Sequence, residues 1–591
     1  MKSVKFRDHK NTIYYVVIGL IVLLGGILRI YFANFEREIV IGTDESSYMF
    51  CSKNILKYCT ITYDRYGEIF NGLIEATPTI TMQIGYPLYL AIFYFFNFDN
   101  SSIFLSQIFL SVINIVLVWK IMELVGINKK IIIFILVIFT LYPGNIYNIN
   151  RLLTENLFTT LFLTFLFFWY TWINKKKYIY LVISSIFLTM SIFVRGSSLP
   201  FLFLSIMYIL IYSKEKIKSM IYLMNPFILM MIPWIIRNYL VFNKFYVLTL
   251  AGENPKIWGA MPYYLDMDSA NGKTLSELIC SSLSINSFLF IRWRVFGFFN
   301  YMFRNVWDES IRHEYLGELL FIHYFVIFSV LLIPIIFYKK DKKTLFLGGI
   351  VLGWIILLLP YHALPRYIFP IIPLLFILLG EEIQIICKSI QKKKYKYKYL
   401  NNFDKFIWRF FCSIAMIGSI LIFYSVFIFS YEIKTEMSEW RLNKYCNTSI
   451  SNIKSEAIFS KKYVLKDSVN NFQKEIKGKE FITLKDSPAI LELPVDITNK
   501  KEEKVITKVT MRYNGGYLFD YATIYWHDGN DGIDTPKFNE NKVYSYPVNL
   551  FQKTHTVYID SDINSLIIIP YVFANNKFNF DSITIEKYTV Q

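Results

Sequence analysis

The sequence predicts a polytopic α-helical membrane protein of about eleven spans, with a β-sandwich at its C-terminal end. Of its 591 residues, 54% are hydrophobic and 18% are charged, whereas a typical soluble domain has about 25% charged residues. A mean hydropathy of +0.38 over this length is too high for one globular core. The composition excludes a disordered chain and a coiled coil, and a length of 591 residues with only six cysteines excludes a disulfide-stapled miniprotein.

Apolar runs near the length of a bilayer-spanning helix, about 20 residues, recur through the first 430 residues. The first run is too long for a signal-peptide core and lacks a small-residue cleavage site, so we expect a retained helix. A shorter run at 84–98 is expected to be re-entrant or interfacial, because counting it as a span would place the lysine clusters outside. The expected spans are residues 13–33, 103–125, 131–148, 156–173, 178–194, 198–213, 219–236, 318–338, 344–361, 366–386 and 407–430.

The net charge of +17 lies entirely in this apolar part, because the 21 basic and 21 acidic residues from residue 431 onward cancel. Every second loop carries a lysine cluster, at 129–130, 175–177, 214–218, 339–343 and 388–409. By the positive-inside rule, these loops and the N-terminus are cytoplasmic. The outer face then holds two large loops, at about 34–102 and 237–317, and the C-terminal tail. This pattern argues against nucleic-acid binding.

The expected domains are a transmembrane part at 1–432, a linker at 433–455 and an extracytoplasmic β-sandwich at 456–591. Short β-rich runs separated by turn-rich stretches predict the sandwich. The segment 528–532 does not fit an EF-hand loop, so a plain turn is favoured over a calcium site. The expected strands are Glu480–Leu484, Val505–Tyr513, Tyr521–Trp526, His555–Ile559, Leu566–Tyr571 and Ser582–Tyr588.

This tail, with its closing segment SLIIIPYVFANNKFNFDSITIEKY, resembles the carbohydrate-binding-module-like jelly rolls appended to bacterial cell-surface enzymes. The resemblance implies a contact with a glycan or another polymer. The alternative is an inert lid on the membrane part.

Four cysteines, Cys51, Cys59, Cys280 and Cys446, would lie outside. A Cys51–Cys59 bridge and unpaired thiols both stay open, because connectivity does not follow from sequence.

Two adjacent carboxylates, Asp44 and Glu45, occur in the first outer loop within GTDESSY. On a helix they diverge by about 100°, so one could face a substrate and the other its supporting shell. A carboxylate here could accept the proton of an attacking hydroxyl. The structural alternative is a helix N-terminus capped by Thr43 or Asp44. The two interpretations are compatible.

Glu155 follows Arg151 by four residues at the outer end of a predicted span, in YPGNIYNINRLLTENLF. Helical spacing favours an Arg151–Glu155 ion pair. The functional alternative is a second carboxylate that faces the same cavity as Asp44.

Three arginines, Arg195, Arg237 and Arg366, lie at the outer ends of different spans, against the positive-inside trend. Guanidinium groups bind phosphate bidentately and stay charged, so a phosphate at the membrane surface is a natural ligand. For any one of them, headgroup snorkelling or a structural ion pair is the alternative. All three together favour the phosphate.

Several catalytic motifs are missing from the sequence. It has no Walker A, GxSxG, HExxH or CxxC motif, and its six histidines are scattered. A nucleotide-driven pump and a zinc protease are therefore poorly supported.

Five strings in this order resemble the polyprenyl-phosphate-sugar-dependent glycosyltransferases of the C-type membrane fold. They are GTDESSY, IGYPLYLAIFYFF, LYPGNIYNINRLLTENLF, PWIIRNYLVFNKF and PRYIFPIIPLLFILLG. The nearest group looks like the bacterial family related to protein O-mannosyltransferases and lipid A aminoarabinose transferases. The resemblance covers roughly residues 13–385 and implies an inverting transfer of a sugar, from a polyprenyl-phosphate donor to a hydroxyl acceptor, on the outer face of the cell membrane.

The resemblance also implies residue roles. Asp44 would be the general base, with Glu45 its neighbour and Glu155 a further acid of the site. The candidates for the donor phosphate are, in order of preference, Arg366, Arg237 and Arg195. Tyr48 and Tyr86 would border the donor groove.

The chain departs from the family pattern at two positions that carry a basic residue in some relatives. Some relatives have a lysine before a Pro-Pro pair where this chain has Gln83-Ile84-Gly85-Tyr86-Pro87, and some have an arginine where it has Ser46 and Ser47. A monophosphate leaving group can be handled by arginine alone, so no cofactor is required. A divalent cation between Asp44 and Glu155 is allowed but not demanded.

Two other functions stay open: a transporter or flippase of lipid-linked substrates, and a non-catalytic surface assembly factor whose tail binds glycan. A transporter would show charged or helix-breaking residues within its spans. The identity of the sugar and of the acceptor (protein, lipid or surface glycan) does not follow from the sequence.

Overall fold

The structure is a computed structural model that divides into two compact units. The first unit comprises residues 1–255, 302–311 and 321–420, and the second comprises 256–301, 312–320 and 421–591. The structure describes residues 2–250, 253–264, 270, 272–304, 320–339, 342–361, 364–390, 413, 416–429, 436–437, 439–446, 457–464, 491–495, 505–515, 520–527, 543–548, 554–559, 563, 565–571 and 578–589.

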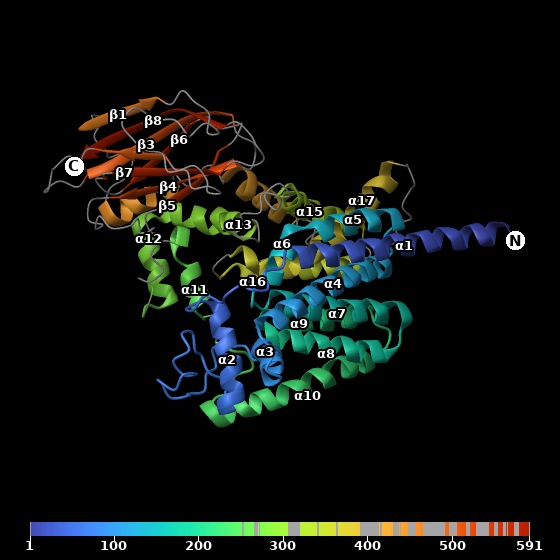
Figure 1. The fold of residues 1–591 in the computed structure, drawn as a ribbon. Coiled ribbons are helices and arrows are strands. Elements are labelled where there is room, and N and C mark those ends of the chain that lie inside the picture. The colour runs from blue at the N-terminus through green and yellow to red at the C-terminus, as the bar shows by residue number, and fades with distance from the viewer. Residues whose placement is uncertain are drawn as a thin grey trace. The chain divides into compact units, whose positions relative to one another are not determined.

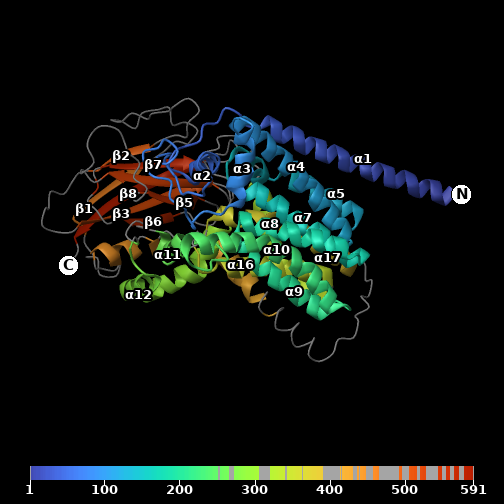
Figure 2. The same ribbon diagram turned by 90° about the horizontal axis from the view of Figure 1, so that it is seen from below.

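The first unit is helical (Figures 1 and 2). Within its described part, five helical stretches are long and apolar enough to cross a membrane, and α5 and α6 form a sixth candidate bent by 49°. The chain is thus a multi-pass membrane protein, and the total of eleven spans stays a prediction. The helices are α1 (Lys2–Tyr31), α2 (Asp44–Tyr58), α3 (Gly85–Phe95), α4 (Asn100–Val125), α5 (Lys129–Leu141), α6 (Pro143–Tyr147), α7 (Glu155–Lys175), α8 (Tyr178–Val194), α9 (Leu199–Tyr212), α10 (Lys216–Phe242), α15 (Leu320–Lys339), α16 (Lys342–Leu358) and α17 (Ile372–Ile390).

Aromatic side chains fill the interior of this unit. The ring of Trp354 on α16 stacks on Phe201 of α9 with centroids 5.6 Å apart, and it lies 5.5 Å from Phe158 of α7. Trp169 of α7 stacks on Phe346 of α16 at 4.8 Å. Such ring pairs add stability beyond the apolar area they bury. We therefore expect the packing of α7, α9 and α16 to be a stable part of this unit. Figure 1 shows α7, α8 and α10 side by side.

Arg29 is a fully buried charged residue in the last turn of α1. Its guanidinium donates to Ser111 Oγ of α4 (2.7 Å), to the Gly25 carbonyl (2.9 Å) and to the Thr140 carbonyl of α5 (3.4 Å). Pro143 begins α6 two residues after α5 ends and has no N–H to offer the preceding turn. One of the Arg29 donors thus reaches a carbonyl in the last turn of α5, next to the α5–α6 break.

The lysine-bearing loops gather at one end of the helical unit. Lys129 Nζ donates to Asn11 Oδ1 near the start of the α1 span (2.7 Å). Lys343 Nζ and Asn174 Nδ2 both donate to the Leu124 carbonyl, at 2.8 and 3.1 Å. Three of the predicted inner loops therefore meet at the N-terminal end of the α1 span.

The other end of α1 meets the segment that precedes α7. Asn150 Nδ2 donates to the Phe32 carbonyl (2.9 Å), and Asn150 Oδ1 accepts from the Asn34 N–H (2.8 Å). About twenty helical residues separate this end from Asn11, roughly 30 Å at 1.5 Å per residue. In both views α2 and α3 lie at this end of the unit, away from the N-terminus (Figures 1 and 2).

The second unit contains helices α11 (Glu253–Gly259), α12 (Leu275–Arg292) and α13 (Phe298–Met302), and two four-stranded antiparallel sheets. One sheet has the order β1-β8-β3-β6 and the other β2-β7-β4-β5. The strands are β1 (Phe459–Val464), β2 (Leu491–Pro494), β3 (Val505–Gly515), β4 (Asp520–His527), β5 (Val543–Val548), β6 (Thr554–Ile559), β7 (Ser565–Tyr571) and β8 (Phe578–Thr589).

Five of the six expected strands correspond to β3, β4, β6, β7 and β8. The expected strand at 480–484 and the turn at 528–532 lie outside the described residues. The strands β1, β2 and β5 are additional to the expectation. The predicted domain boundaries at 432 and 456 stay predictions.

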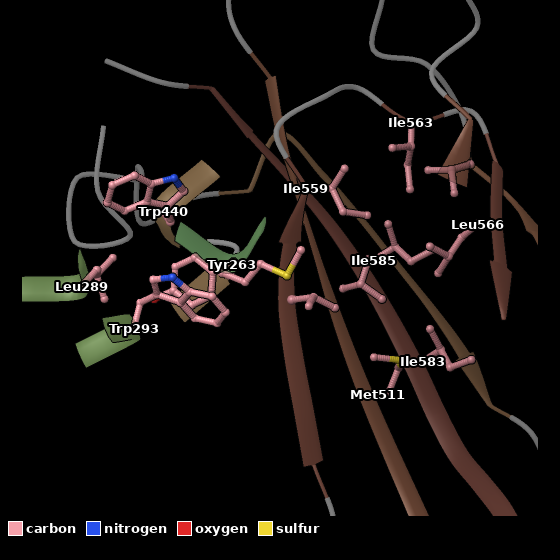
Figure 3. Packing of buried hydrophobic residues seen from close by; sticks show 14 of the residues in the cluster. Tyr263, Leu289, Trp293, Trp440, Met511, Ile559, Ile563, Leu566, Ile583 and Ile585 are labelled. Atoms are coloured by element: carbon pink, nitrogen blue, oxygen red, sulfur yellow. The ribbon is translucent and has the colours of Figure 1, made fainter. Parts of the chain in front are cut away.

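One hydrophobic cluster connects the strands to the helices of this unit (Figure 3). Met511, Ile559 and Ile583 on the first sheet and Leu566 on the second belong to the same cluster as Trp293, which directly follows α12. The full cluster also contains Tyr263, Leu289, Phe290, Phe429, Met437, Trp440, Val495, Val509, Val557, Ile563 and Ile585.

Candidate functional site

The acidic pair begins α2, as the capping interpretation predicts. Thr43 is the N-cap, and its Oγ1 accepts from the Ser46 N–H (3.5 Å) while Ser46 Oγ accepts from the Thr43 N–H (3.1 Å). This reciprocal capping fixes the first turn. Gly42 just before it has φ +86°, a conformation that glycine adopts without strain. The sequence therefore sets the direction in which Asp44 and Glu45 leave the helix.

Asp44 pairs with Arg366, 322 residues further along the chain. Arg366 Nη2 donates to Asp44 Oδ2 at 2.5 Å. The Asp44 side chain is 47% exposed and that of Arg366 31%. Arg366 lies in a short 3-10 turn at Pro365–Tyr367, before α17. Its Nε is buried and has no acceptor in the described part of the chain.

Glu45 is held by two other arginines. Its side chain is 3% exposed, and its carboxylate oxygens lie 2.7 Å from Arg37 Nη1 and 2.7 Å from Arg151 Nε. Arg37 Nη1 also donates to the Asn150 carbonyl (2.9 Å). Glu45 therefore anchors α2 to the segment before α7.

Glu155 pairs with Arg195, and not with Arg151 as its spacing suggested. Arg195 Nη2 donates to Glu155 Oε1 (2.5 Å), and Arg195 Nε donates to Thr154 Oγ1 (2.6 Å). Arg151 has extended backbone angles of φ −118° and ψ 130°, and α7 starts only at Glu155. The two side chains are therefore not on one helical face. Glu155 Oε2 is buried and accepts no hydrogen bond from any residue that the structure describes.

These charges share one neighbourhood around Tyr48. Burial raises the pKa of the Tyr48 hydroxyl, and the charges of Asp44 and Glu155 raise it further, while Arg195 and Arg366 lower it. The structure thus brings together Asp44, Glu155 and two of the three predicted arginines.

The start of α3 lies against this group. The ring of Tyr86 meets that of Tyr48 edge-on at 5.1 Å, and its hydroxyl accepts from Gln107 Nε2 of α4 (3.0 Å). A Cβ on Gly85 would lie 2.7 Å from the carbonyl carbon of Phe193 and 2.8 Å from the Val194 nitrogen. Gly85 is therefore what lets α3 approach the end of α8 closely enough to place Tyr86.

Arg237 lies apart from these pairs. Its Nη1 donates to Asn238 Oδ1 (3.0 Å) and to the Thr79 carbonyl (3.4 Å), and its guanidinium lies over the rings of Trp234 and Phe242. No ion pair joins Arg237 to a carboxylate in the described part of the chain.

The predicted outer cysteines Cys51 and Cys59 are free thiols. Cys51 is fully buried, and burial raises the pKa of its thiol to about 12. It is therefore inert at neutral pH.

The acids of the site do not fit a divalent cation. Among the described residues, no group of three or more His, Cys, Asp or Glu side chains could hold a metal ion. Asp44 and Glu155 each already face an arginine, which competes with a cation for the carboxylate.

Sequence reasoning missed the roles of Arg37, Arg151 and Thr154. Arg37 and Arg151 are ordinary basic residues next to predicted spans, and only the fold brings both to Glu45. Thr154 looked like part of a loop, and its hydroxyl is the second acceptor for Arg195. No spacing rule would have identified any of them.

No protein-family model matches the chain, and no curated protein does. Among solved structures, the archaeal oligosaccharyltransferase AglB from Archaeoglobus fulgidus, in complex with an inhibitory peptide and a dolichol-phosphate, is similar with a TM-score of 0.41 and 14% identity. The match covers 73% of this chain but only 58% of that protein.

Two further solved structures are similar at the same level or below. ArnT from Cupriavidus metallidurans, bound to undecaprenyl phosphate, has a TM-score of 0.40 and 12% identity, with 72% of each chain covered. Arabinosyltransferase EmbB from Mycobacterium smegmatis has a TM-score of 0.33 and 9% identity, covering 97% of this chain and 64% of that one.

Proposed function

We propose that this protein is an inverting glycosyltransferase that moves a sugar from a polyprenyl-phosphate donor to a hydroxyl acceptor on the outer face of the membrane. The observation that carries the proposal is the convergence of an exposed carboxylate, Asp44, with Arg366 and the Glu155–Arg195 pair. A proton acceptor beside a phosphate-binding cation is what this transfer needs. The motif resemblance in the sequence supports the same reaction.

In the proposed reaction the acceptor hydroxyl attacks the anomeric carbon from the face opposite the phosphate. The bond from that carbon to the phosphate oxygen breaks as the new glycosidic bond forms, and its electron pair leaves with the polyprenyl phosphate. Asp44 takes the hydroxyl proton, and Arg366 neutralises charge that develops on the phosphate. Neither step is routed through a metal ion.

The other residues would position the reactants. Glu45 holds the start of α2 against Arg37 and Arg151, so that Asp44 keeps its direction. Glu155 Oε2 is a buried acceptor without a partner and suits a sugar hydroxyl. Tyr48 and Tyr86 would form one wall of the donor groove. Arg237 is kept as a second candidate for the donor headgroup.

The tail domain is proposed to be a jelly roll that contacts a glycan. In the part of the tail that the structure describes, two four-stranded sheets in the order β1-β8-β3-β6 and β2-β7-β4-β5 are compatible with the double-sheet arrangement of that fold. We place the tail and the Asp44 side of the membrane unit outside the cell, and the lysine-bearing loops in the cytoplasm.

The proposal is tested by transfer of labelled sugar from a polyprenyl-phosphate donor pool in membranes that contain the protein. Asp44→Asn should reduce transfer by about 10²–10⁴-fold, the usual contribution of a general base, at an unchanged protein level. Glu38→Gln is the matched control, because Glu38 is an exposed acid of the same loop, and it should transfer normally. Unchanged transfer by Asp44→Asn would remove Asp44 from its role.

A transporter of lipid-linked substrates is the second candidate, and one observation favours it. Arg29 on α1 and Glu382 on α17 are charged residues buried within candidate spans, which in membrane proteins often mark a transport pathway. Movement of a labelled polyprenyl-phosphate lipid across liposomes, without glycosyl transfer, would support this alternative.

A further inference from the structure

The two site arginines differ in how their guanidinium edges are used. Arg195 presents its Nε–Nη2 edge to two acceptors, Thr154 Oγ1 and Glu155 Oε1. Among the described residues, Arg366 presents the same edge to one acceptor: its Nη2 donates to Asp44 Oδ2, while its buried Nε has no acceptor. The Nε–Nη2 edge of Arg195 is therefore occupied, whereas the same edge of Arg366 has an unused donor beside its ion pair.

A phosphate fits the edge of Arg366 better than Asp44 does. Phosphate oxygens accept two parallel hydrogen bonds from one guanidinium edge, and such bidentate pairs are among the stronger contacts in proteins. The Asp44 carboxylate satisfies one of these two donors and is itself half-exposed. Replacing it with a phosphate would satisfy the buried Nε and release a carboxylate to which solvent and substrate have access.

The pairing also occupies Asp44. Its Oδ2 accepts the hydrogen bond from Arg366 Nη2, so the carboxylate that would receive the hydroxyl proton is directed at the arginine. Once a phosphate has taken the arginine, this carboxylate can turn to the acceptor hydroxyl.

We propose that the donor phosphate displaces Asp44 from Arg366, so that binding of the donor unmasks the general base. This inference rests on the proposed function and adds an order to it: the donor binds first, and only then can the acceptor hydroxyl lose its proton. Without bound donor, Asp44 stays ion-paired with Arg366, the same residue that will hold the leaving phosphate.

The test measures binding of farnesyl methyl phosphate to the full-length protein in nanodiscs. This prenyl phosphodiester carries one negative charge and no sugar. Because it must compete with Asp44 for Arg366, Asp44→Asn should bind it at least about tenfold more tightly than the wild type. Glu38→Gln, which removes a charge from the same loop, should bind like the wild type. A gain in affinity cannot arise from a misfolded variant.

The double variant separates displacement from general charge repulsion. Arg366→Met should bind the phosphodiester at least about tenfold more weakly, and Asp44→Asn combined with Arg366→Met should bind no better than Arg366→Met alone. If Asp44→Asn gives no gain, or if its gain persists without Arg366, the displacement is overturned and the proposed transfer is unaffected. If neither the wild type nor Asp44→Asn binds the phosphodiester, a polyprenyl-phosphate donor is contradicted as well.

Discussion

Neighbouring residues with the same chemistry take different roles at the start of α2. Asp44 is half-exposed and faces one arginine, whereas Glu45 is buried between two. Adjacent helical positions point about 100° apart, so the capping by Thr43 that fixes the helix start also decides which acid faces the site. The sequence predicted this division in general terms. It could not assign the partners, because they come from distant segments.

The predicted Arg151–Glu155 ion pair is absent from the described structure for a local reason. The i,i+4 rule holds only inside a helix, and residues 148–150 form a 3-10 turn that ends in an extended Arg151. The expected span at 156–173 begins one residue after Glu155, so this helix start was already indicated. The rule was applied across a helix boundary, and the pairing it predicted was wrong.

Glu45→Gln tests the anchoring role. The substitution keeps the side-chain volume but leaves Arg37 and Arg151 without their carboxylate. We expect a loss of roughly 1–3 kcal/mol in stability, the usual cost of an unsatisfied buried polar group, seen as a lower apparent Tm, together with weaker transfer. Glu38→Gln is again the matched control. An unchanged Tm would show that Glu45 does not anchor α2.

Glu382→Gln is expected to stabilise the protein. Both carboxylate oxygens of Glu382 are buried on α17 and accept no hydrogen bond. Removing the ionisable group should raise stability by roughly 1–3 kcal/mol, measured as a higher apparent Tm in detergent. Glu382→Asp keeps the carboxylate and should give no such gain. A lower Tm for Glu382→Gln would indicate a required role for the carboxylate, as a transport pathway would have.

At the scale of elements, hydrophobic run length predicted the helices well, since α4, α7, α8, α9 and α10 all lie within a few residues of the expected spans. The strands were predicted less completely. β1 and β5 are edge strands that each pair with one neighbour, and β2 has four residues. Short edge strands bury little and have weak alternation, so their sequences carry little signal.

Gly85→Ala tests the packing of α3 on α8. The added methyl group would meet the backbone of Phe193 and Val194 at under 3 Å, and backbone cannot move aside as a side chain can. We expect a loss of roughly 1–3 kcal/mol in stability and a displaced Tyr86, hence weaker transfer. Gly19→Ala on α1 is the control, because nothing lies within 4 Å of its added Cβ. Equal behaviour of the two variants would contradict the close approach.

At the scale of the whole chain, the two ends of the helical unit carry different groups of residues. The Lys129, Lys343 and Asn174 contacts gather predicted inner loops at one end of the α1 span. Asn150 meets Phe32 at the other end, next to the Arg37–Glu45 pair. The charge pattern predicted this separation from sequence alone. By the positive-inside rule, the lysine-bearing end is predicted to face the cytoplasm.

The proposed outer-face location of the Asp44 site can be measured by cysteine labelling on intact cells. Single cysteines at position 38, near Asp44, and at position 177, in a lysine cluster, are placed in a variant without native cysteines and treated with a membrane-impermeant maleimide on intact cells. We predict labelling at 38 before permeabilisation and at 177 only after it. Labelling of residue 177 from outside, with residue 38 reached only after permeabilisation, would put the acids and arginines on the cytoplasmic side and contradict an outer-face transferase.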